Sequence, residues 1–500
     1  MKKILYAASE ARPYGGAGGL ADVAGSYPRA LKSKGVDCRI VMPLYKMPDE
    51  LRKSMTFVTS FDVWLSWRKQ HCEIFEAESG GVTYYFINNM HYFKRNELYG
   101  EPDEAERFAF FSLAVLVMLP LIDFKPDIIH ANDWHTALIP VYRHVFYADN
   151  EFYSDIKTVL TIHNISFQGN CDLGILSSVF GLPYGAKNLV EHEGRINLLK
   201  GGIETANAFT TVSPYYAKEI AGDSETREYD FGRGLTWFIK DREYKLKGIL
   251  NGLDKDKDPK TDKDIFKNYG VKDFQAGKRE NKLKLYERLL EEEQNRNYTL
   301  ALDKTPDVPL IAIVTRIDSQ QKGCQIILDA VHDIDGGLLD GEDAQFIILG
   351  TAPNGDGKGK SMEDAFKEAA YTYKGKMSAV IAYSQELAQK IYAASDIFLV
   401  PSLYEPCGLT QMIALKYGSV PVVRETGGLK DTVKDNQNGD GNGFTFKEYS
   451  GYALKSAVRR AMDSYKNTDE WNKLIKRAMA CDFDWAKSSA DEYIKLYESL

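Results

Sequence analysis

The sequence has no surplus of basic residues. Its 63 Lys and Arg face 71 Asp and Glu, which gives a formal net charge of -8 over 500 residues. Proteins that bind nucleic acid neutralise phosphates with Lys and Arg, so this balance excludes nucleic acid as an expected partner. A local cluster of cations that binds a small phosphate compound stays compatible with it.

Cysteine is also scarce, and no two cysteines are spaced as a CxxC pair. The six are Cys38, Cys72, Cys171, Cys324, Cys407 and Cys481. So few scattered cysteines in a long chain do not form a disulfide framework, and we expect a reducing, cytoplasmic setting.

Long apolar runs are missing as well. The longest covers residues 113–119, whereas a membrane-spanning helix needs about 20 apolar residues. Near the N-terminus, residues 4–8 are too few for the apolar core of a signal peptide, and Glu10 follows them. We therefore expect a buried helix in the first case, a β-strand in the second, and no membrane partner.

What the sequence contains is an alternation of short apolar runs with helical patterns. In the first half, the apolar runs lie at residues 4–7, 39–42, 83–87, 127–130 and 157–162. In the second half, they lie at residues 310–314, 345–349, 397–400 and 420–423. Helical patterns fit residues 20–34, 324–331, 385–394 and 409–416. This rhythm predicts βαβ units in two doubly wound, Rossmann-like α/β domains, divided near Gly248, before the polar residues 254–267.

Three segments of the first half place polar groups after an expected strand. Residues 15–22 (GGAGGLAD) open a helix, and their N–H groups fit an anion site as well as a plain turn. Residues 130–135 (HANDWH) and 161–164 (TIHN) follow two further strands, where parallel sheets bind ligands. Asp133 and His163 are therefore candidate binding residues, with a purely structural role as the alternative.

A zinc site on His130 and His135 is a second interpretation of the same region. Zinc needs three or four protein ligands, and no third or fourth ligand is evident nearby. We therefore expect no metal.

The second half carries cations and a carboxylate at its strand ends. Arg316 and Lys322 lie in residues 315–323 (TRIDSQQKG), and such side chains favour a phosphate site over a solvated basic loop. Glu405 lies in residues 401–411 (PSLYEPCGLTQ), where a carboxylate suits sugar hydroxyls. In the same segment Cys407 is a conceivable nucleophile, but no His is adjacent in sequence to activate it, so packing or binding is favoured.

In this order, these segments resemble the bacterial glycogen and plant starch synthase family, from Lys3 to nearly the last residue. The more specific stretches are residues 161–169, 405–411 and 424–433. Shorter agreements are residues 98–100 (LYG), 105–108 (AERF), 211–214 (TVSP) and 482–485 (DFDW), with Asn251 and Tyr383.

The resemblance implies a GT-B architecture, two Rossmann-like domains facing each other across a deep cleft. Residues 1–247 would form the acceptor-side domain and residues 248–480 the nucleotide-sugar-binding domain. Residues 481–500 would form a helix that crosses back to the first domain.

The resemblance also implies an activity: retaining transfer of glucose from ADP-glucose, or UDP-glucose, to the non-reducing end of an α-1,4-glucan such as glycogen. No cofactor and no metal are implied, and the oligomeric state stays open. Arg316 and Lys322 would neutralise the departing diphosphate. Glu405, Asp133 and His163 would complete the catalytic set around the donor glucose.

Substrate-binding roles are implied for nine further residues. They are Gly18, Gly19, Tyr99, Asn251, Tyr383, Cys407, Gly408, Leu409 and Thr410. Backbone groups of the first two and the last two would hold phosphates, and Tyr383 would stack on the base.

Three positions depart from the family pattern. Gly16 stands where the family has Lys, the loop from Arg316 to Lys322 is one residue longer, and a Trp is absent from residues 254–259. These departures motivate an alternative, a weakened or inactive glucan-binding paralogue. A transferase with another acceptor, as in sucrose or trehalose synthesis, and a zinc hydrolase on His130 and His135 are further alternatives.

Overall fold

The computed structural model describes residues 2–16, 18–225, 229–296 and 300–500. The chain forms two compact units. Unit 1 contains the residues up to Asp254 together with Asp484–Leu500, and unit 2 is Lys255–Phe483. The expected divisions were 247/248 and 480/481, so both lie a few residues earlier than the divisions between the units.

Unit 1 is built on a nine-stranded sheet in the order β12-β11-β7-β6-β1-β2-β5-β4-β3. Pairing is parallel from β12 to β5 and antiparallel for β5-β4 and β4-β3. The strands are β1 Lys3–Ala7, β2 Asp37–Pro43, β3 Thr56–Leu65, β4 Arg68–Ser79, β5 Val82–Asn88, β6 Ile128–Asn132, β7 Lys157–Ile162, β11 Ala208–Thr211 and β12 Leu246–Gly248. A small antiparallel sheet adds β8 Asn170–Cys171, β9 Glu191–His192 and β10 Arg195–Asn197.

The helices of unit 1 lie in the segments that connect or follow these strands. They are α1 Gly19–Ser33, α2 Asp49–Lys53, α3 Met90–Phe93, α4 Glu104–Met118, α5 Leu138–Phe146, α6 Lys187–Val190, α7 Leu198–Thr205, α8 Pro214–Ile220, α9 Thr236–Lys240 and α18 Ser489–Glu498. The apolar run at residues 113–119 lies in the buried α4 and the short 3-10 turn after it, as expected. Among the described residues, no helix is long and apolar enough to cross a membrane.

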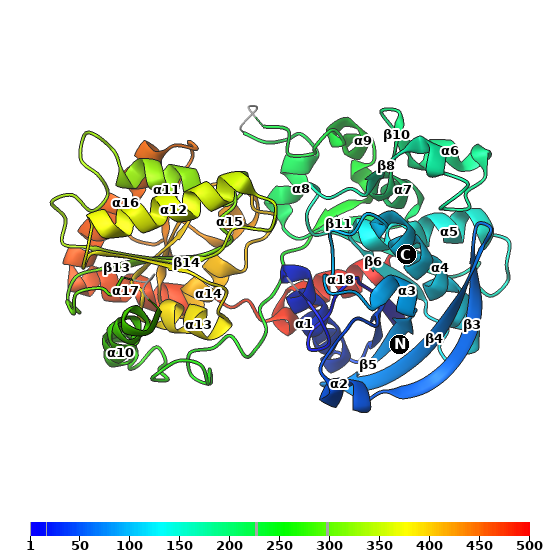
Figure 1. Cartoon of the computed structure of the whole chain (residues 1–500), viewed down its shortest axis with the longest axis horizontal. Coiled ribbons are helices and arrows are strands. Elements are labelled where there is room, and N and C mark those ends of the chain that lie inside the picture. Colours follow the sequence, from blue (N-terminus) through cyan, green and yellow to red (C-terminus); the bar gives the residue numbers. More distant parts are fainter. Residues whose placement is uncertain (1, 17, 226–228, 297–299) are drawn as a thin grey trace. The chain divides into compact units, whose positions relative to one another are not determined.

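Unit 2 is built on a six-stranded, fully parallel sheet in the order β15-β14-β13-β16-β17-β18. Its strands are β13 Leu310–Val314, β14 Gln345–Gly350, β15 Met377–Ile381, β16 Ile397–Val400, β17 Val420–Arg424 and β18 Phe444–Phe446. Its helices are α10 Phe274–Arg296, α11 Cys324–Val331, α12 Gly357–Thr372, α13 Gln385–Ala394, α14 Thr410–Lys416, α15 Gly427–Thr432, α16 Gly451–Lys466 and α17 Thr468–Met479. Helices α11 and α12 lie on one side of the sheet, and α10 and α13 on the other (Figure 1).

Each unit has its own buried apolar core. Together with the parallel sheets, this confirms the prediction of two doubly wound α/β domains. The long hairpin of β3 and β4 was not predicted. Its outer strand β3 is the edge of the sheet and is mostly exposed or half-buried, so it carries a weak apolar signal.

Candidate active site

The predicted site residues lie in two groups, one in each unit. In unit 1, β6 and β7 are neighbouring parallel strands, and Asn132 at the end of β6 pairs with Thr161. Because the carboxyl ends of the two strands meet at one edge, the residues that follow them, Asp133 and His163, come together.

Asp133 is held in an unusual backbone conformation. Its φ is +56°, in the left-handed region that a residue with a Cβ rarely adopts. Its Oδ1 accepts hydrogen bonds from the backbone N–H groups of His163 at 2.7 Å and Asn164 at 3.3 Å. These two bonds fix the carboxylate at the sheet edge, and the strain is typical of a functional position.

Burial sets the protonation of both side chains. It raises the pKa of Asp133 to about 7, with the two backbone N–H groups opposing the rise and the charge of Glu10 adding to it. Burial lowers the pKa of His163 to about 3. At neutral pH, His163 is therefore an uncharged hydrogen-bonding group and not an acid.

The Gly-rich segment and Tyr99 are in unit 1 as well. Gly18 is the N-cap of α1, and Gly18 and Gly19 are exposed. A Cβ on Gly16 would lie 2.1 Å from the Ala21 Cβ, so a Lys there needs a local movement of the loop. The Tyr99 hydroxyl is 2.9 Å from the Ser9 Oγ.

The side-chain amide of Asn251 has a buried oxygen without a hydrogen-bond donor among the described residues. Only 6% of the residue is exposed, and its side-chain Oδ1 is buried with no hydrogen-bond partner among the described residues. A buried amide oxygen without a partner costs free energy, so a hydroxyl that donates to it would be favourable.

In unit 2, the predicted cations and carboxylate converge. Lys322 lies in the loop between β13 and α11, and Glu405 follows β16, which is the neighbour of β13. The Lys322 Nζ is 2.7 Å from the Glu405 Oε2. Ser402 Oγ donates to the same carboxylate oxygen at 2.9 Å, so Glu405 is held from two sides.

Hydrogen bonds to the Asp318 side chain hold the loop from Arg316 to Lys322. The Asp318 Oδ1 accepts from the backbone N–H groups of Gln321 at 2.6 Å and Lys322 at 3.2 Å. The Arg316 Nη2 donates to the Gln321 Oε1 at 3.0 Å. The Arg316 side chain is 56% exposed. The loop therefore presents both cations at the carboxyl edge of the sheet.

Glu405 begins a loop whose backbone is shaped by Gln411. The Gln411 Nε2 donates to the carbonyl oxygens of Cys407 at 3.0 Å and Gly408 at 2.7 Å. Gly408 has a φ of +71°, which suits glycine. Leu409 and Thr410 then lead into α14. Neither Gln411 nor Ser402 was predicted from the sequence as a site residue.

A cavity of about 160 Å³ opens at this edge. Its lining residues are Ile313, Val314, Thr315, Arg316, Lys322, Leu399, Val400, Ser402, Glu405 and Thr410. Cys407, which follows Glu405 by two positions, is buried. Tyr383 lies in the segment between β15 and α13 and is 76% exposed. The structure thus brings Arg316, Lys322, Glu405 and Thr410 to one cavity.

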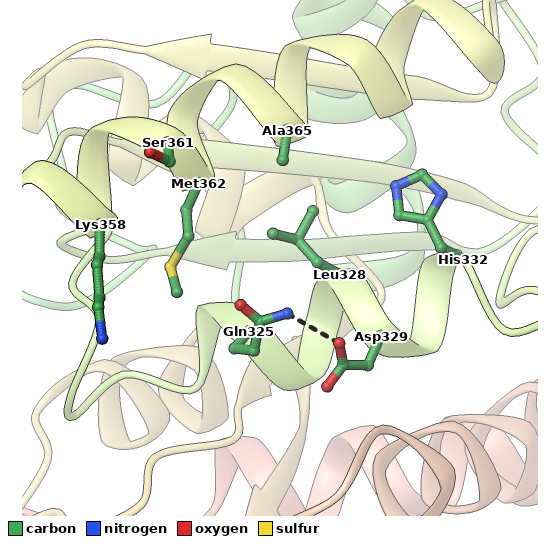
Figure 2. Close-up of a pocket in the computed structure, with 8 residues that line it drawn as sticks. All are labelled: Gln325, Leu328, Asp329, His332, Lys358, Ser361, Met362 and Ala365. Carbon is green, nitrogen blue, oxygen red and sulfur yellow. Dashed lines mark hydrogen bonds between the residues drawn. The ribbon is translucent and has the colours of Figure 1, made fainter.

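A larger groove of about 780 Å³ lies elsewhere in unit 2, between α11 and α12 (Figure 2). Its lining residues are Gln325, Leu328, Asp329, His332, Lys358, Ser361, Met362 and Ala365. Within α11, the Gln325 Nε2 donates to the Asp329 Oδ1 at 2.9 Å. None of the predicted site residues lines it, so the smaller cavity is the candidate site.

The zinc interpretation is wrong for His130. Its Nδ1 is 2.6 Å from the Tyr497 hydroxyl and its Nε2 is 2.6 Å from the Thr161 Oγ1, so both ring nitrogens are occupied. Among the residues with described positions, no group of three or more His, Cys, Asp or Glu is arranged to hold a metal ion.

Comparisons with known proteins cover the whole chain. A family model described as the starch synthase catalytic domain matches residues 3–241, and one described as glycosyl transferases group 1 matches residues 295–478. The catalytic domain of starch synthase IV from Arabidopsis thaliana, bound to ADP and acarbose, is a similar structure. It has a TM-score of 0.86 and 32% sequence identity over 100% of this chain and 99% of that chain.

Full-length relatives point the same way. A glycogen synthase of Clostridium botulinum (strain Alaska E43 / Type E3) is 45% identical over 100% of this chain and 99% of its own length. A glycogen synthase of Lactobacillus acidophilus is 41% identical over 100% of this chain and 99% of its own. These relatives give no support to the alternative of an inactive paralogue.

Proposed function

The chain belongs to the glycogen and starch synthase family of glycosyltransferases, and we propose that it transfers glucose from ADP-glucose to the non-reducing end of an α-1,4-glucan with retention at the anomeric carbon. The observation that carries the proposal is the meeting of Lys322, Glu405 and Arg316 at one cavity. ADP on the starch synthase neighbour supports the choice of donor base.

The cations match the charge that the reaction develops. As the glycosidic bond to the diphosphate breaks, negative charge grows on the departing phosphate. Arg316, with its planar donors, and Lys322, with its compact ammonium, are placed to stabilise that charge. Their role is electrostatic, and they act most strongly in the transition state.

Glu405 serves the sugar in this proposal. Its Oε2 is engaged by Lys322 and Ser402, which leaves Oε1 to accept from a hydroxyl of the donor glucose. The acceptor hydroxyl attacks the anomeric carbon on the face that the diphosphate leaves, and its proton passes to the departing phosphate. No pair of side-chain carboxylates acting as acid and nucleophile enters this scheme.

The groups of unit 1 bind substrate in the proposal. Asp133, His163 and Asn251 contact the donor glucose, Tyr99 adds a further substrate contact, and Gly18 and Gly19 offer backbone N–H groups to phosphate. In unit 2, Cys407, Gly408, Leu409 and Thr410 border the phosphates, and the exposed ring of Tyr383 stacks on the base.

The test is incorporation of labelled glucose into glycogen by the purified protein, with ADP-glucose and UDP-glucose side by side. We expect incorporation from ADP-glucose, in α-1,4 linkages that a β-amylase digests. Faster incorporation from UDP-glucose would overturn the donor assignment. No incorporation from either donor by the folded protein would overturn the activity.

A further inference from the structure

The side chain of Asn132 has a fixed orientation. Its Nδ2 donates to the backbone carbonyl oxygens of Ala7 at 3.0 Å and His130 at 3.3 Å. If the amide were rotated by half a turn, Oδ1 would face two carbonyl oxygens with no hydrogen between them. Because Asn132 is fully buried, no water offsets that repulsion, so the amide keeps this orientation.

The fixed Oδ1 determines the protonation of its neighbour. This oxygen accepts from the Tyr6 hydroxyl at 2.7 Å and lies 2.9 Å from the His163 Nε2. An amide oxygen only accepts, so His163 Nε2 must carry the hydrogen. The backbone N–H of His163 donates to the Asp133 Oδ1 at 2.7 Å, which fixes the backbone from which the ring extends.

The surroundings keep the ring neutral. Burial lowers the pKa of His163 to about 3. Titratable groups near it are His130 within β6, Asp133 directly after β6 and Tyr6 on β1. The Asp133 carboxyl faces the backbone N–H of His163, and Tyr6 is separated from the ring by Asn132. In a neutral ring protonated at Nε2, Nδ1 is a hydrogen-bond acceptor, and no described group donates to it.

We propose that Asn132 is a positioning residue that holds His163 in the Nε2–H tautomer, so that Nδ1 accepts a hydrogen bond from a hydroxyl of the sugar substrate. The hydroxyl contact rests on the proposed function, whereas the tautomer rests on unit 1 alone. A hydroxyl that donates to Nδ1 is oriented by the protein, and a ring protonated at Nδ1 would repel the same hydrogen.

The discriminating variant is Asn132→Leu. It removes the acceptor beside Nε2, so the hydrogen of the neutral ring is free to move to Nδ1, which is then a donor and no longer an acceptor. With the ring labelled by ¹⁵N, we expect a protonated Nδ1 on His163 in a substantial share of the molecules, and kcat should fall at least tenfold.

The matched control is Tyr6→Phe. It removes the other donor to the Asn132 Oδ1 but leaves the bond to His163, so the ring signals of His163 and kcat should stay those of the parent. A His163 ring that stays fully protonated at Nε2 in Asn132→Leu, or one protonated at Nδ1 in Tyr6→Phe, would overturn the proposal.

A second measurement does not depend on activity or on the folding of the variant. The parent, with its eight His labelled by ¹⁵N in the ring, is recorded by NMR from pH 5 to 8, and the signals missing in His163→Gln identify His163. Protonated Nε2 with unprotonated Nδ1 is expected. The opposite tautomer or an imidazolium at pH 7 would overturn the assignment even if glucose transfer is confirmed. If the tautomer is found but the parent transfers no glucose, the proposed function and the hydroxyl contact fail, while the tautomer assignment stands.

Discussion

The Lys322–Glu405 ion pair is the central contact of the unit 2 cavity. The side chains are 20% and 8% exposed, so both charges are largely removed from water. A pair in such a place adds little net stability, because desolvation offsets most of the attraction. Its value is therefore in presenting a cation and a carboxylate at fixed positions for a ligand.

Replacing either partner removes a group that faces the ligand and also leaves the other charge without its partner. We expect Lys322→Ala and Glu405→Ala each to lower kcat more than tenfold in the glucose-incorporation assay. Lys360→Ala is the matched control, because it removes a Lys–Glu pair of 2.9 Å whose Lys side chain is 60% exposed. Turnover near that of the parent in either site variant would contradict its assigned role.

The buried carboxyl of Asp133 predicts a pH dependence of stability. Its pKa is raised to about 7 in the folded protein, against about 3.9 in an unfolded chain. The group therefore stabilises the fold below pH 4, and that contribution is lost as the pH rises toward 7.

Asp133→Asn keeps an oxygen that accepts from the same two N–H groups but carries no charge. At pH 8, we expect the free energy of unfolding of Asp133→Asn to exceed that of the parent by about 1–3 kcal/mol. Near pH 4, the difference should vanish. Melting temperatures of both proteins across this range measure it. A difference that grows toward acid pH would contradict the raised pKa.

At the scale of elements, the turn before α1 limits what position 16 accepts. A Cβ on Gly16 would approach the Ala21 Cβ to 2.1 Å, and the Glu10 Oε2 lies 3.5 Å from the same point. The packing of Ala21 in the first turn of the helix therefore limits the size of the residue at position 16. A cation introduced there would lie beside the buried carboxylate of Glu10.

Gly16→Lys should consequently destabilise unit 1 by about 1–3 kcal/mol through overpacking. Gly16→Lys combined with Ala21→Gly removes the clashing methyl group and should recover part of the loss, with Ala21→Gly alone as the control. Calorimetric melting of the three variants tests this. Equal melting of the parent and Gly16→Lys would show that the loop moves freely.

At the scale of the whole molecule, the last residues of the chain belong to unit 1. Helix α18 packs against α1. The Tyr497 hydroxyl lies 2.6 Å from the His130 Nδ1 and 2.7 Å from the Tyr27 hydroxyl. Because each unit has a separate core, a change at Tyr497 should act on one unit.

Tyr497→Phe leaves two buried polar groups short of a partner and should cost about 1–3 kcal/mol. We expect the unfolding transition of unit 1 alone to shift to lower temperature. Tyr417→Phe removes a buried hydroxyl that donates to Asp262 at 2.5 Å, and it should shift only the transition of unit 2. Calorimetry on the full chain distinguishes the two, and a joint shift in both variants would contradict independent cores.

Local sequence determined the bounds of several strands and helices of the two cores. The strands Lys157–Ile162, Leu310–Val314 and Ile397–Val400 and the helices Cys324–Val331 and Gln385–Ala394 have the bounds that their apolar patterns predict. Buried parallel strands are continuous apolar runs, so their limits are visible without a partner. The polar residues after such runs, Asp133, His163, Arg316 and Glu405, were recognisable for the same reason.

Only the tertiary structure decided which of these polar residues meet. Lys322 and Glu405 are far apart in the chain, and they touch because β13 and β16 are neighbours in the sheet order. The role of Asn132 depends on two carbonyl oxygens, one from β1 and one from its own strand, and on a ring from the loop after β7. Strand order and side-chain orientation are properties of the packed fold, and no local pattern of residues encodes them.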